Sequence, residues 1–430
     1  MKLMIVGSGG REHALAECLA CSDAVEMIHV IPGNDGLYFG CHNKIKKVLL
    51  PQQSLNNQQL IQYAKLAEID FTIVGPEMYL AQGIVDDFKA HGLKIFGPTK
   101  NASQLESSKI FSKEVMIRAS ISTAQSYAFN SSQSALSFLE KTNWNQMVVK
   151  CDGLASGKGV VVCENKEQAL NAIIDFMVKD CLGFKVESIL IEEMLVGKEV
   201  SVFYLCDGKS SVFLNSACDH KRLLNHDLGP NTGGMGAYSP APIFTKSDAV
   251  MIQKSVVQPL LNEMNLMNKS FQGVLFIGLM KTASGYKVLE FNTRFGDPET
   301  QTILPLLNED LLPWLLASAE GKLDQFPQNI QLKNKKSIHV VMAANGYPGL
   351  GEQKIQNGDE IFIDSEIQSK IFFAGVKMQD QKLKTYGGRI LGLTSTSDSF
   401  KNSRHQVYDD LKKIQFKGSH YRTDIGDELC

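Results

Sequence analysis

The chain has 430 residues, of which 43% are hydrophobic and 21% charged, and its formal net charge is −2. This composition is typical of a soluble globular protein, and the length exceeds what one ordinary core can fill, so we expect three or four domains. The near-neutral charge excludes a general attraction to nucleic acid or anionic membranes, and no apolar run approaches a membrane span. Any recognition of phosphate must therefore be local.

Nine cysteines are scattered through the sequence. Cys18 and Cys21 form a C-x-x-C pair, but no second pair completes a zinc site, and buried or idle thiols are the preferred interpretation. An odd number of unpatterned cysteines is typical of a reducing cytosol. Because the chain begins with a strand and a glycine turn rather than a signal peptide, we expect a cytoplasmic protein.

The first hundred residues alternate short apolar runs with helical periods. Strands are predicted at 3–6, 27–31, 71–74 and 94–96, and helices at 12–20, 60–67 and 83–91. This alternation indicates a doubly wound parallel sheet. Ligands bind beyond the carboxyl ends of such strands, which is where the loops rich in glycine and proline fall.

The loop after the first strand, Gly7 to Glu12, partly matches a dinucleotide-binding fingerprint. Glu12 replaces its third glycine, and the second strand ends in Pro32-Gly33-Asn34 rather than in an acidic residue, which disfavours a nicotinamide site. A glycine-rich turn at a helix start can still hold one phosphate on its backbone N–H groups, helped by Arg11.

A second unit spans residues 120–191, with strands predicted at 147–150, 160–163 and 188–191 and a helix at 167–179. Its loop, 152–159, is not a Walker A motif, because it joins two strands and Gly159 replaces the Ser or Thr that would hold magnesium. Such a hairpin can close over nucleotide phosphates with Lys150 and Lys158 pointing inward. A mobile surface hairpin is the alternative.

The segment Val288–Gln301 alternates apolar and polar residues before it enters a charged turn. Strand geometry predicts Leu289 and Phe291 on one face, and Glu290, Asn292 and Arg294 on the other. A carboxylate and an amide oxygen suit Mg²⁺, and the arginine suits an anionic group. An edge strand with a solvated face is the alternative, but the two further carboxylates in 296–299 favour a functional site.

Other segments complete the inventory. Residues 192–199 follow a buried strand and can offer main-chain groups to an adenine and a carboxylate to ribose. The loop 229–240, with several glycines and prolines, is long enough to indicate function. After a polar linker near 325–336, strands at 337–343, 360–363, 370–374 and 390–393 and a helix at 399–414 predict a small α+β domain. Together these features favour phosphoryl transfer from a nucleotide to a carboxylate, which gives an acyl phosphate that an amine can capture.

The sequence resembles the phosphoribosylamine–glycine ligase (glycinamide ribonucleotide synthetase) family of ATP-grasp enzymes. The resemblance spans almost the whole chain and rests on residues 7–14, 75–77, 150–160, 219–222, 229–240 and 290–301. It implies an α/β and α+β multidomain fold. The expected parts are an N-terminal doubly wound parallel sheet (1–103), an ATP-grasp core of two α+β subdomains (104–327, with a small lid at 120–191), and a C-terminal α+β domain (328–430).

The resemblance also implies the reaction. ATP, glycine and 5-phosphoribosylamine would give ADP, phosphate and glycinamide ribonucleotide through a glycyl phosphate, in de novo purine biosynthesis. The metal would be Mg²⁺ or Mn²⁺, no nucleic acid or membrane partner is expected, and the protein would be a monomer or a weak homodimer. The alternatives are another ATP-grasp ligase, acting on an aminoimidazole ribonucleotide or on D-alanine, and a non-catalytic nucleotide-binding protein.

Site roles follow from the same resemblance. The metal ligands would be Glu290 and Asn292. The ATP-binding residues would be Lys109, Lys150, Gly157, Lys158, Gly159, Glu192, Glu193, Met194, Leu195 and Glu199. Asp219, Lys221, Arg294 and Asp297 would surround glycine and the acyl phosphate as the catalytic group. The second substrate would contact Gly9, Gly10, Arg11, Glu12, Asn34, Gly75, Pro76 and Glu77, with Pro298 and Glu299 also in the substrate site.

Three departures from the family pattern stand out. Cys218 replaces a common glutamine, Cys151 replaces a small alanine, and Phe373-Ala374-Gly375-Val376 replaces the common His-Ala-Gly-Thr. No site role is assigned to Phe373.

Overall fold

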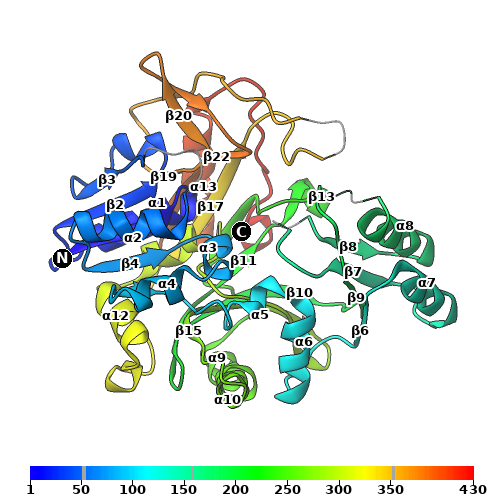
Figure 1. Cartoon of the computed structure of the whole chain (residues 1–430). Helices are drawn as coiled ribbons and strands as arrows, with labels where there is room; N and C mark the ends of the chain where they lie inside the picture. The colour runs from blue at the N-terminus through cyan, green and yellow to red at the C-terminus, as the bar shows by residue number, and fades with distance from the viewer. Residues whose placement is uncertain (51–54, 156–157, 180, 182, 351–353) are drawn as a thin grey trace.

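The computed structural model describes residues 1–50, 55–155, 158–179, 181, 183–350 and 354–430. Its N-terminal part is a five-stranded parallel sheet in the order β3-β2-β1-β4-β5 (Figure 1). The strands are β1 (Lys2–Gly7), β2 (Met27–Pro32), β3 (Ile45–Lys47), β4 (Phe71–Val74) and β5 (Ile95–Phe96). The helices are α1 (Gly10–Ala20), α2 (Asn57–Leu66), α3 (Glu77–Ala81) and α4 (Ile84–Ala90), with a 3₁₀ turn at Asp35–Tyr38.

Alternate residues of β1 face two different cores. Leu3 and Ile5 pack with the buried face of α1, whereas Met4 and Val6 pack with α2 and α4. The predicted doubly wound sheet is therefore confirmed. The prediction worked because a strand that is covered on both faces has a continuous apolar sequence.

The lid is a four-stranded antiparallel sheet in the order β6-β9-β7-β8 with two helices on one face. Its elements are β6 (Ser126–Phe129), α7 (Ser132–Lys141), β7 (Met147–Cys151), β8 (Val160–Cys163), α8 (Lys166–Met177) and β9 (Ile189–Glu193). The lid has its own apolar core, and in Figure 1 it projects away from the N-terminal sheet. The strands and helix predicted for this unit are confirmed.

The centre of the molecule is an eight-stranded sheet in the order β16-β15-β10-β11-β14-β17-β22-β19. Its strands are β10 (Lys198–Asp207), β11 (Ser211–Asp219), β14 (Gly236–Ser239), β15 (Gln272–Thr282), β16 (Gly285–Asn292), β17 (Lys336–Ala343), β19 (Lys370–Phe373) and β22 (Arg389–Ser397). Because β14 pairs with β17, the sheet runs without a break across the expected limit at residue 328. The domain limits 1–103, 104–327 and 328–430 stay predictions.

The remaining elements surround this sheet. They are α5 (Gln104–Ser107), α6 (Lys109–Arg118), α9 (Lys246–Ile252), a π turn (Gln253–Val257), α10 (Gln258–Leu266), α11 (Thr300–Ile303), α12 (Leu312–Glu320) and α13 (Phe400–Leu411). Three two-stranded sheets lie outside it: β12 (Arg222–Leu224) with β13 (Leu228–Asn231), β18 (Phe362–Ile363) with β23 (Ile414–Gln415), and β20 (Val376–Gln379) with β21 (Lys382–Thr385). No helix in the described ranges is long and apolar enough to cross a membrane.

One sequence prediction for β16 is wrong. Leu289 and Phe291 were expected on the core face, but the buried residues are Val288 and Phe291, and Leu289 is only half-buried. The pairing with β15 shifts register between Gly278 and Leu279, so one residue is inserted at Leu289. Such a bulge breaks the strict alternation of faces.

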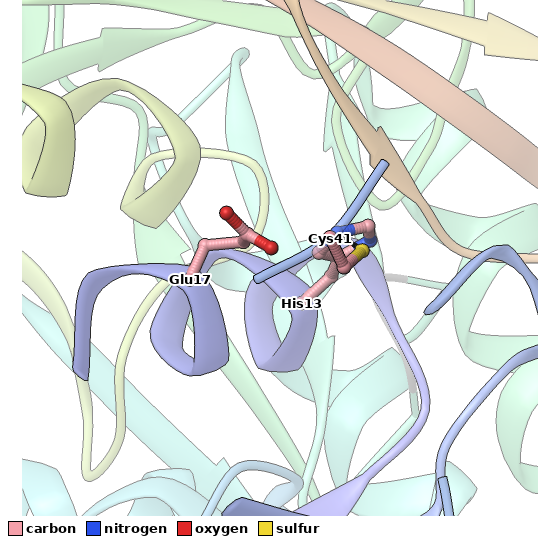
Figure 2. A group of neighbouring side chains, drawn as sticks. All are labelled: His13, Glu17 and Cys41. Carbon is pink, nitrogen blue, oxygen red and sulfur yellow. Dashed lines mark hydrogen bonds between the residues drawn. The ribbon is translucent and has the colours of Figure 1, made fainter. Parts of the chain in front are cut away.

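A cluster of three potential metal ligands joins the N-terminal helix to the C-terminal strand β19. Figure 2 shows His13 and Glu17 projecting from adjacent turns of α1 toward Cys41. His13 Nδ1 accepts a hydrogen bond from Phe373 N (3.0 Å), and burial lowers the pKa of His13 to about 4, so the ring is neutral and Nε2 carries the proton.

That proton points at Cys41 Sγ, 3.1 Å from Nε2. Glu17 is also engaged, since it pairs with Lys370 and accepts a hydrogen bond from His42 N (3.0 Å). A metal-bound histidine donates its second ring N–H, whereas Nδ1 of His13 faces a donor. The cluster therefore connects α1 of the N-terminal domain to β19 of the C-terminal domain through hydrogen bonds and an ion pair.

Asp410 fastens the segment that leads into β19. Its buried carboxylate accepts hydrogen bonds from Gln368 N (3.1 Å) and Ser369 N (2.8 Å) and pairs with Lys413 (3.0 Å). Burial alone would raise the pKa of Asp410, but the hydrogen bonds from Gln406, Lys413 and Ser369 outweigh it and lower the pKa to about 2.

We predict that Asp410→Asn lowers the free energy of unfolding by about 2 kcal/mol at pH 7, because the variant loses the stabilised carboxylate. A carboxylate whose pKa is lower in the folded than in the unfolded protein stabilises the fold at pH values above its unfolded pKa. The difference in unfolding free energy between wild type and variant should therefore be largest above roughly pH 4 and should shrink as the pH falls toward 2. Urea unfolding followed by circular dichroism across this range measures it. Asp409→Asn removes a more exposed neighbour and is the control. Equal losses in both variants would contradict the assignment.

Candidate active site

The first glycine-rich loop is built around the buried carboxylate of Glu12. Its oxygens accept hydrogen bonds from Gly9 N (2.6 Å) and Arg11 Nε (2.6 Å). A Cβ atom at Gly75 would lie only 1.8 Å from Glu12 Oε1, so the loop after β4 approaches as closely as it does only because it carries glycine. Glu12 thus joins the two loops that the sequence predicted to receive a phosphate.

Two residues predicted to contact the second substrate have their polar groups engaged within the protein. Arg11 Nη1 donates to Phe295 O (3.2 Å), in addition to the Glu12 pair. The Asn34 amide donates to Ser8 O (2.8 Å) and Phe373 O (3.0 Å) and accepts from Gly36 N (2.9 Å). Both side chains hold the loops in place. Gly9 donates its N–H to Glu12 and accepts from His13 N, so of the two glycines at the helix start Gly10 is the candidate backbone contact.

Arg294 lies between two carboxylates from other elements. Its Nε donates to Glu77 Oε2 (3.0 Å), just after Pro76, and its Nη2 lies 2.9 Å from Glu106 Oε1. Burial alone would lower the pKa of Arg294, but Glu106 and Glu77 outweigh it and raise the pKa. Glu106 was missed in the sequence, although it lies three residues before the predicted Lys109, and it also accepts from Thr293 N (2.8 Å).

The turn between β16 and α11 is held by an arginine from β22. Arg389 Nη2 donates to Asp297 Oδ2 (2.8 Å), and its Nη1 donates to Asp297 O (2.9 Å) and Gly233 O (2.6 Å). Burial alone would raise the pKa of Asp297, but Arg389 and Arg11 outweigh it and lower the pKa.

The loops at Gly234 and Gly9 lie against this turn, and Gly234 can approach it so closely only because it has no side chain. A Cβ atom at Gly234 would lie 2.4 Å from Pro298 Cδ, and one at Gly9 would lie 3.4 Å from Asp297 Oδ2. Tyr347 supports the same loop by accepting a hydrogen bond from Gly233 N (3.0 Å). Neither Arg389 nor Tyr347 was predicted as a site residue. The glycines next to each of them in the sequence were the one feature that could have indicated a site.

Asp219 and Lys221, at the end of β11, extend the site. Lys221 Nζ lies 2.7 Å from Glu199 Oε2 and 3.9 Å from Asp219 Oδ2. Burial alone would lower the pKa of Lys221, but Asp219, Glu199 and Glu290 outweigh it and raise the pKa well above its usual value. Burial raises the pKa of Asp219.

Glu290 and Asn292 have the character of metal ligands. Within the described residues, no group donates a hydrogen bond to the Glu290 carboxylate. Burial alone would raise its pKa, but Lys221, Lys150 and Lys109 outweigh it and lower the pKa. A carboxylate kept ionised without a hydrogen bond, two residues from an amide oxygen, fits a hard cation such as Mg²⁺.

The expected ATP-binding residues converge at the junction of β16 with the lid. Lys150 Nζ lies 2.8 Å from Glu192 Oε2 and donates to Leu289 O (3.3 Å), and Lys109 donates to Gly153 O (3.0 Å). Glu192 also pairs with Lys113 (3.1 Å), one helical turn after Lys109, which the sequence reading missed.

The rest of the expected nucleotide site lies nearby. Glu193 accepts from Gln125 N (3.0 Å) and pairs with Lys287 (3.1 Å). Met194 and Leu195 are half-buried in the connection to β10, whereas Glu199 and Lys158 are exposed and Gly159 is buried. Gly157 lies outside the described residues. Lys158 was expected to point inward, toward the nucleotide phosphates, but its side chain is exposed to solvent in this structure.

Family models for the N domain, the ATP-grasp (A) domain and the C domain of phosphoribosylglycinamide synthetase match residues 1–106, 107–300 and 337–428. The phosphoribosylamine–glycine ligase of Caldanaerobacter subterraneus subsp. tengcongensis is 41% identical over 429 residues, which cover 99% of each chain. The chain belongs to the phosphoribosylglycinamide synthetase family. This confirms the resemblance noted in the sequence.

Other members and structures agree. The human trifunctional purine biosynthetic protein adenosine-3 is 42% identical, and the match covers 99% of this chain and 42% of the human one. A crystal structure of phosphoribosylamine–glycine ligase from Thermotoga maritima superposes with a TM-score of 0.84 at 29% identity, covering 99% of this chain and all of that one.

A biotin carboxylase domain from Hydrogenobacter thermophilus, in complex with MgADP, ADP and bicarbonate, has a TM-score of 0.72 at 16% identity. It covers 98% of this chain and 91% of that one. At this identity the likeness shows the fold alone. The multidomain ATP-grasp fold class predicted from the sequence is confirmed.

The packing of Glu12 against Gly75 gives a test of the loop arrangement. We predict that Gly75→Ala lowers the free energy of unfolding by about 1–3 kcal/mol, because the new methyl group overlaps the Glu12 carboxylate. In a Glu12→Ala background the same substitution should cost much less, since the obstructing atoms are gone. Urea unfolding of the four proteins gives the coupling energy, and strict additivity would contradict the contact.

Proposed function

We propose that this family member joins glycine to 5-phosphoribosylamine at the expense of ATP, giving glycinamide ribonucleotide, ADP and phosphate in de novo purine biosynthesis. The observation that carries the proposal is the position of β16. The charges of Lys109, Lys150 and Lys221 reach its Glu290, Asn292 Oδ1 lies 3.5 Å from Arg294 Nη2, and the following turn contacts the glycine-rich loops of the N-terminal and central domains. β16 and the turn after it would therefore lie between the nucleotide and a second, anionic substrate.

On the nucleotide side, Lys109 and Lys150 bind ATP phosphates, the segment from Glu192 to Leu195 lines the adenine, and Glu199 lies at the ribose. Glu290 and Asn292 would hold Mg²⁺ or Mn²⁺, which neutralises charge on the phosphates when bound. Three lysines have charges that reach Glu290, and fixed positive charges of this kind stabilise a transferring phosphoryl group.

On the other side, the glycine carboxylate attacks the γ-phosphate of ATP and glycyl phosphate forms. Asp219 and Asp297 are the carboxylates available for the glycine ammonium, while Arg294 and Lys221 offset the negative charge of the acyl phosphate. The 5-phosphate of the amine substrate lies at the start of α1, where the Gly10 N–H binds it, while the Gly9 N–H stays on Glu12. Its amine then displaces phosphate to form the amide.

Positioning carries most of the catalysis in this scheme. Arg294 is oriented before substrate arrives, because Glu77 and Glu106 hold it on two sides. A preoriented charge does not have to reorganise during the reaction. A monomer or a weak homodimer stays our expectation for the assembly.

The first test is the substrate requirement. We predict that ADP release, measured by a coupled assay, depends on glycine, because the γ-phosphate is transferred only to its carboxylate. Bicarbonate or D-alanine should not replace glycine. ADP release that is unchanged without glycine would overturn the proposed activity and favour another ATP-grasp ligase or an ATPase.

The second test is the metal pair. We predict that Glu290→Ala lowers kcat by orders of magnitude while circular dichroism shows an unchanged fold, because the phosphates lose the cation that the carboxylate holds. Glu187→Ala, at an exposed lid position, should leave kcat unchanged. Near-normal turnover of the Glu290 variant would contradict the metal role.

A further inference from the structure

Amide formation releases a proton. When the amine nitrogen bonds to the acyl carbon and phosphate leaves with its electron pair, the nitrogen must give up one proton, and an acceptor beside the acyl group speeds this step. The carboxylates around the turn 296–299 are the candidates for this proton acceptor. They differ in whether another side chain already binds them.

Most of these carboxylates are already engaged. Asp297 is bound by Arg389 and by Gln301 Nε2 (2.8 Å), and Glu77 and Glu106 are bound by Arg294. Asp219 faces Ser201 Oγ (3.4 Å) and Lys221 (3.9 Å). A cation next to a carboxylate stabilises its ionised form and occupies its oxygens. Burial still raises the pKa of Glu106 and of Asp219, but Arg294 pairs with Glu106 and Lys221 lies 3.9 Å from Asp219.

Glu299 differs from all of them. It is 3% exposed, and among the described residues no other residue donates a hydrogen bond to its carboxylate or pairs with it. The side chain folds back over its own turn, since a Cβ atom at Gly296 would lie 2.5 Å from Glu299 Oε2. Burial and the negative charge of Asp219 outweigh the positive charges of Lys221 and Arg294 and raise the pKa of Glu299 to about 8.

We propose that Glu299 is the general base of the amide-forming step. It takes the proton from the amine of 5-phosphoribosylamine as the C–N bond forms and the C–O bond to phosphate breaks. The inference rests on the proposed function, and it places Glu299 in contact with the second substrate after glycyl phosphate has formed. The first step, attack of the glycine carboxylate on ATP, releases no proton and does not use Glu299.

The test compares two acceptors of the glycyl group. Hydroxylamine is a strong nucleophile of low basicity, so it attacks acyl phosphates without a protein base and gives glycine hydroxamate, which is measured by its iron complex. With ATP and glycine, Glu299→Gln should make hydroxamate within about threefold of wild type, and with 5-phosphoribosylamine its kcat should fall by about a hundredfold or more. Glu164→Gln, at an exposed position, should change neither rate.

The pH dependence gives an independent readout. A base must be deprotonated to act, so the wild-type rate with 5-phosphoribosylamine should rise through about pH 8 relative to the hydroxylamine rate, and Glu299→Gln should lack this relative rise.

The outcomes separate the two hypotheses. If wild type makes no hydroxamate, no glycyl phosphate forms and the proposed function fails. The general-base role is overturned in two cases in which wild type makes hydroxamate. In the first, Glu299→Gln loses the rates with hydroxylamine and with 5-phosphoribosylamine equally, and in the second it keeps both rates. Retained hydroxamate formation also shows that the variant is folded and binds ATP and glycine.

Discussion

The active site depends on the ion pair between Arg389 and Asp297. This contact fixes the turn after β16 against β22, and the same guanidinium holds Gly233 of the glycine-rich loop. Gly9 and Gly234 approach this turn from two other directions without side chains of their own. Three distant parts of the chain therefore meet at four residues, 296–299, and the geometry around the reacting groups is set by long-range contacts rather than by any one loop.

Opposite charges alternate at this junction. Lys221, Lys150 and Lys109 lower the pKa of Glu290 against the effect of burial, Arg389 pairs with Asp297, and Arg294 contacts Glu77 and Glu106. A chain with a net charge of −2 can thus bind phosphate through individual lysines, without an overall excess of positive charge. Fixed charges of this kind stabilise developing charge without the cost of reorienting water.

The sequence predicted local features well and long-range pairs poorly. Periodicity predicted β1, β2, β4 and β5 and the helices α1, α2 and α4, because strands buried on both faces, such as β1, leave a plain apolar run, but it missed the short elements β3 and α3. The bulge at Leu289 could not be seen, since it arises from pairing with β15. Glu106, Lys113, Arg389 and Tyr347 were missed for the same reason: each acquires its role from a partner distant in sequence. The union of β14 with β17 is likewise a pairing that no local pattern encodes.

The lid differs from the rest of the molecule in how it is joined. It has a separate apolar core, and its contacts with the body include polar ones, such as Lys287 with Glu193, Thr123 Oγ1 with Val288 O, and Lys150 with Leu289 O. Polar contacts can be exchanged for contacts with phosphate or water at small cost, whereas opening an apolar core cannot. Lys150 therefore belongs to a lid that is joined to the body partly by polar contacts, whereas Arg294 and Asp297 are held by ion pairs with distant parts of the chain.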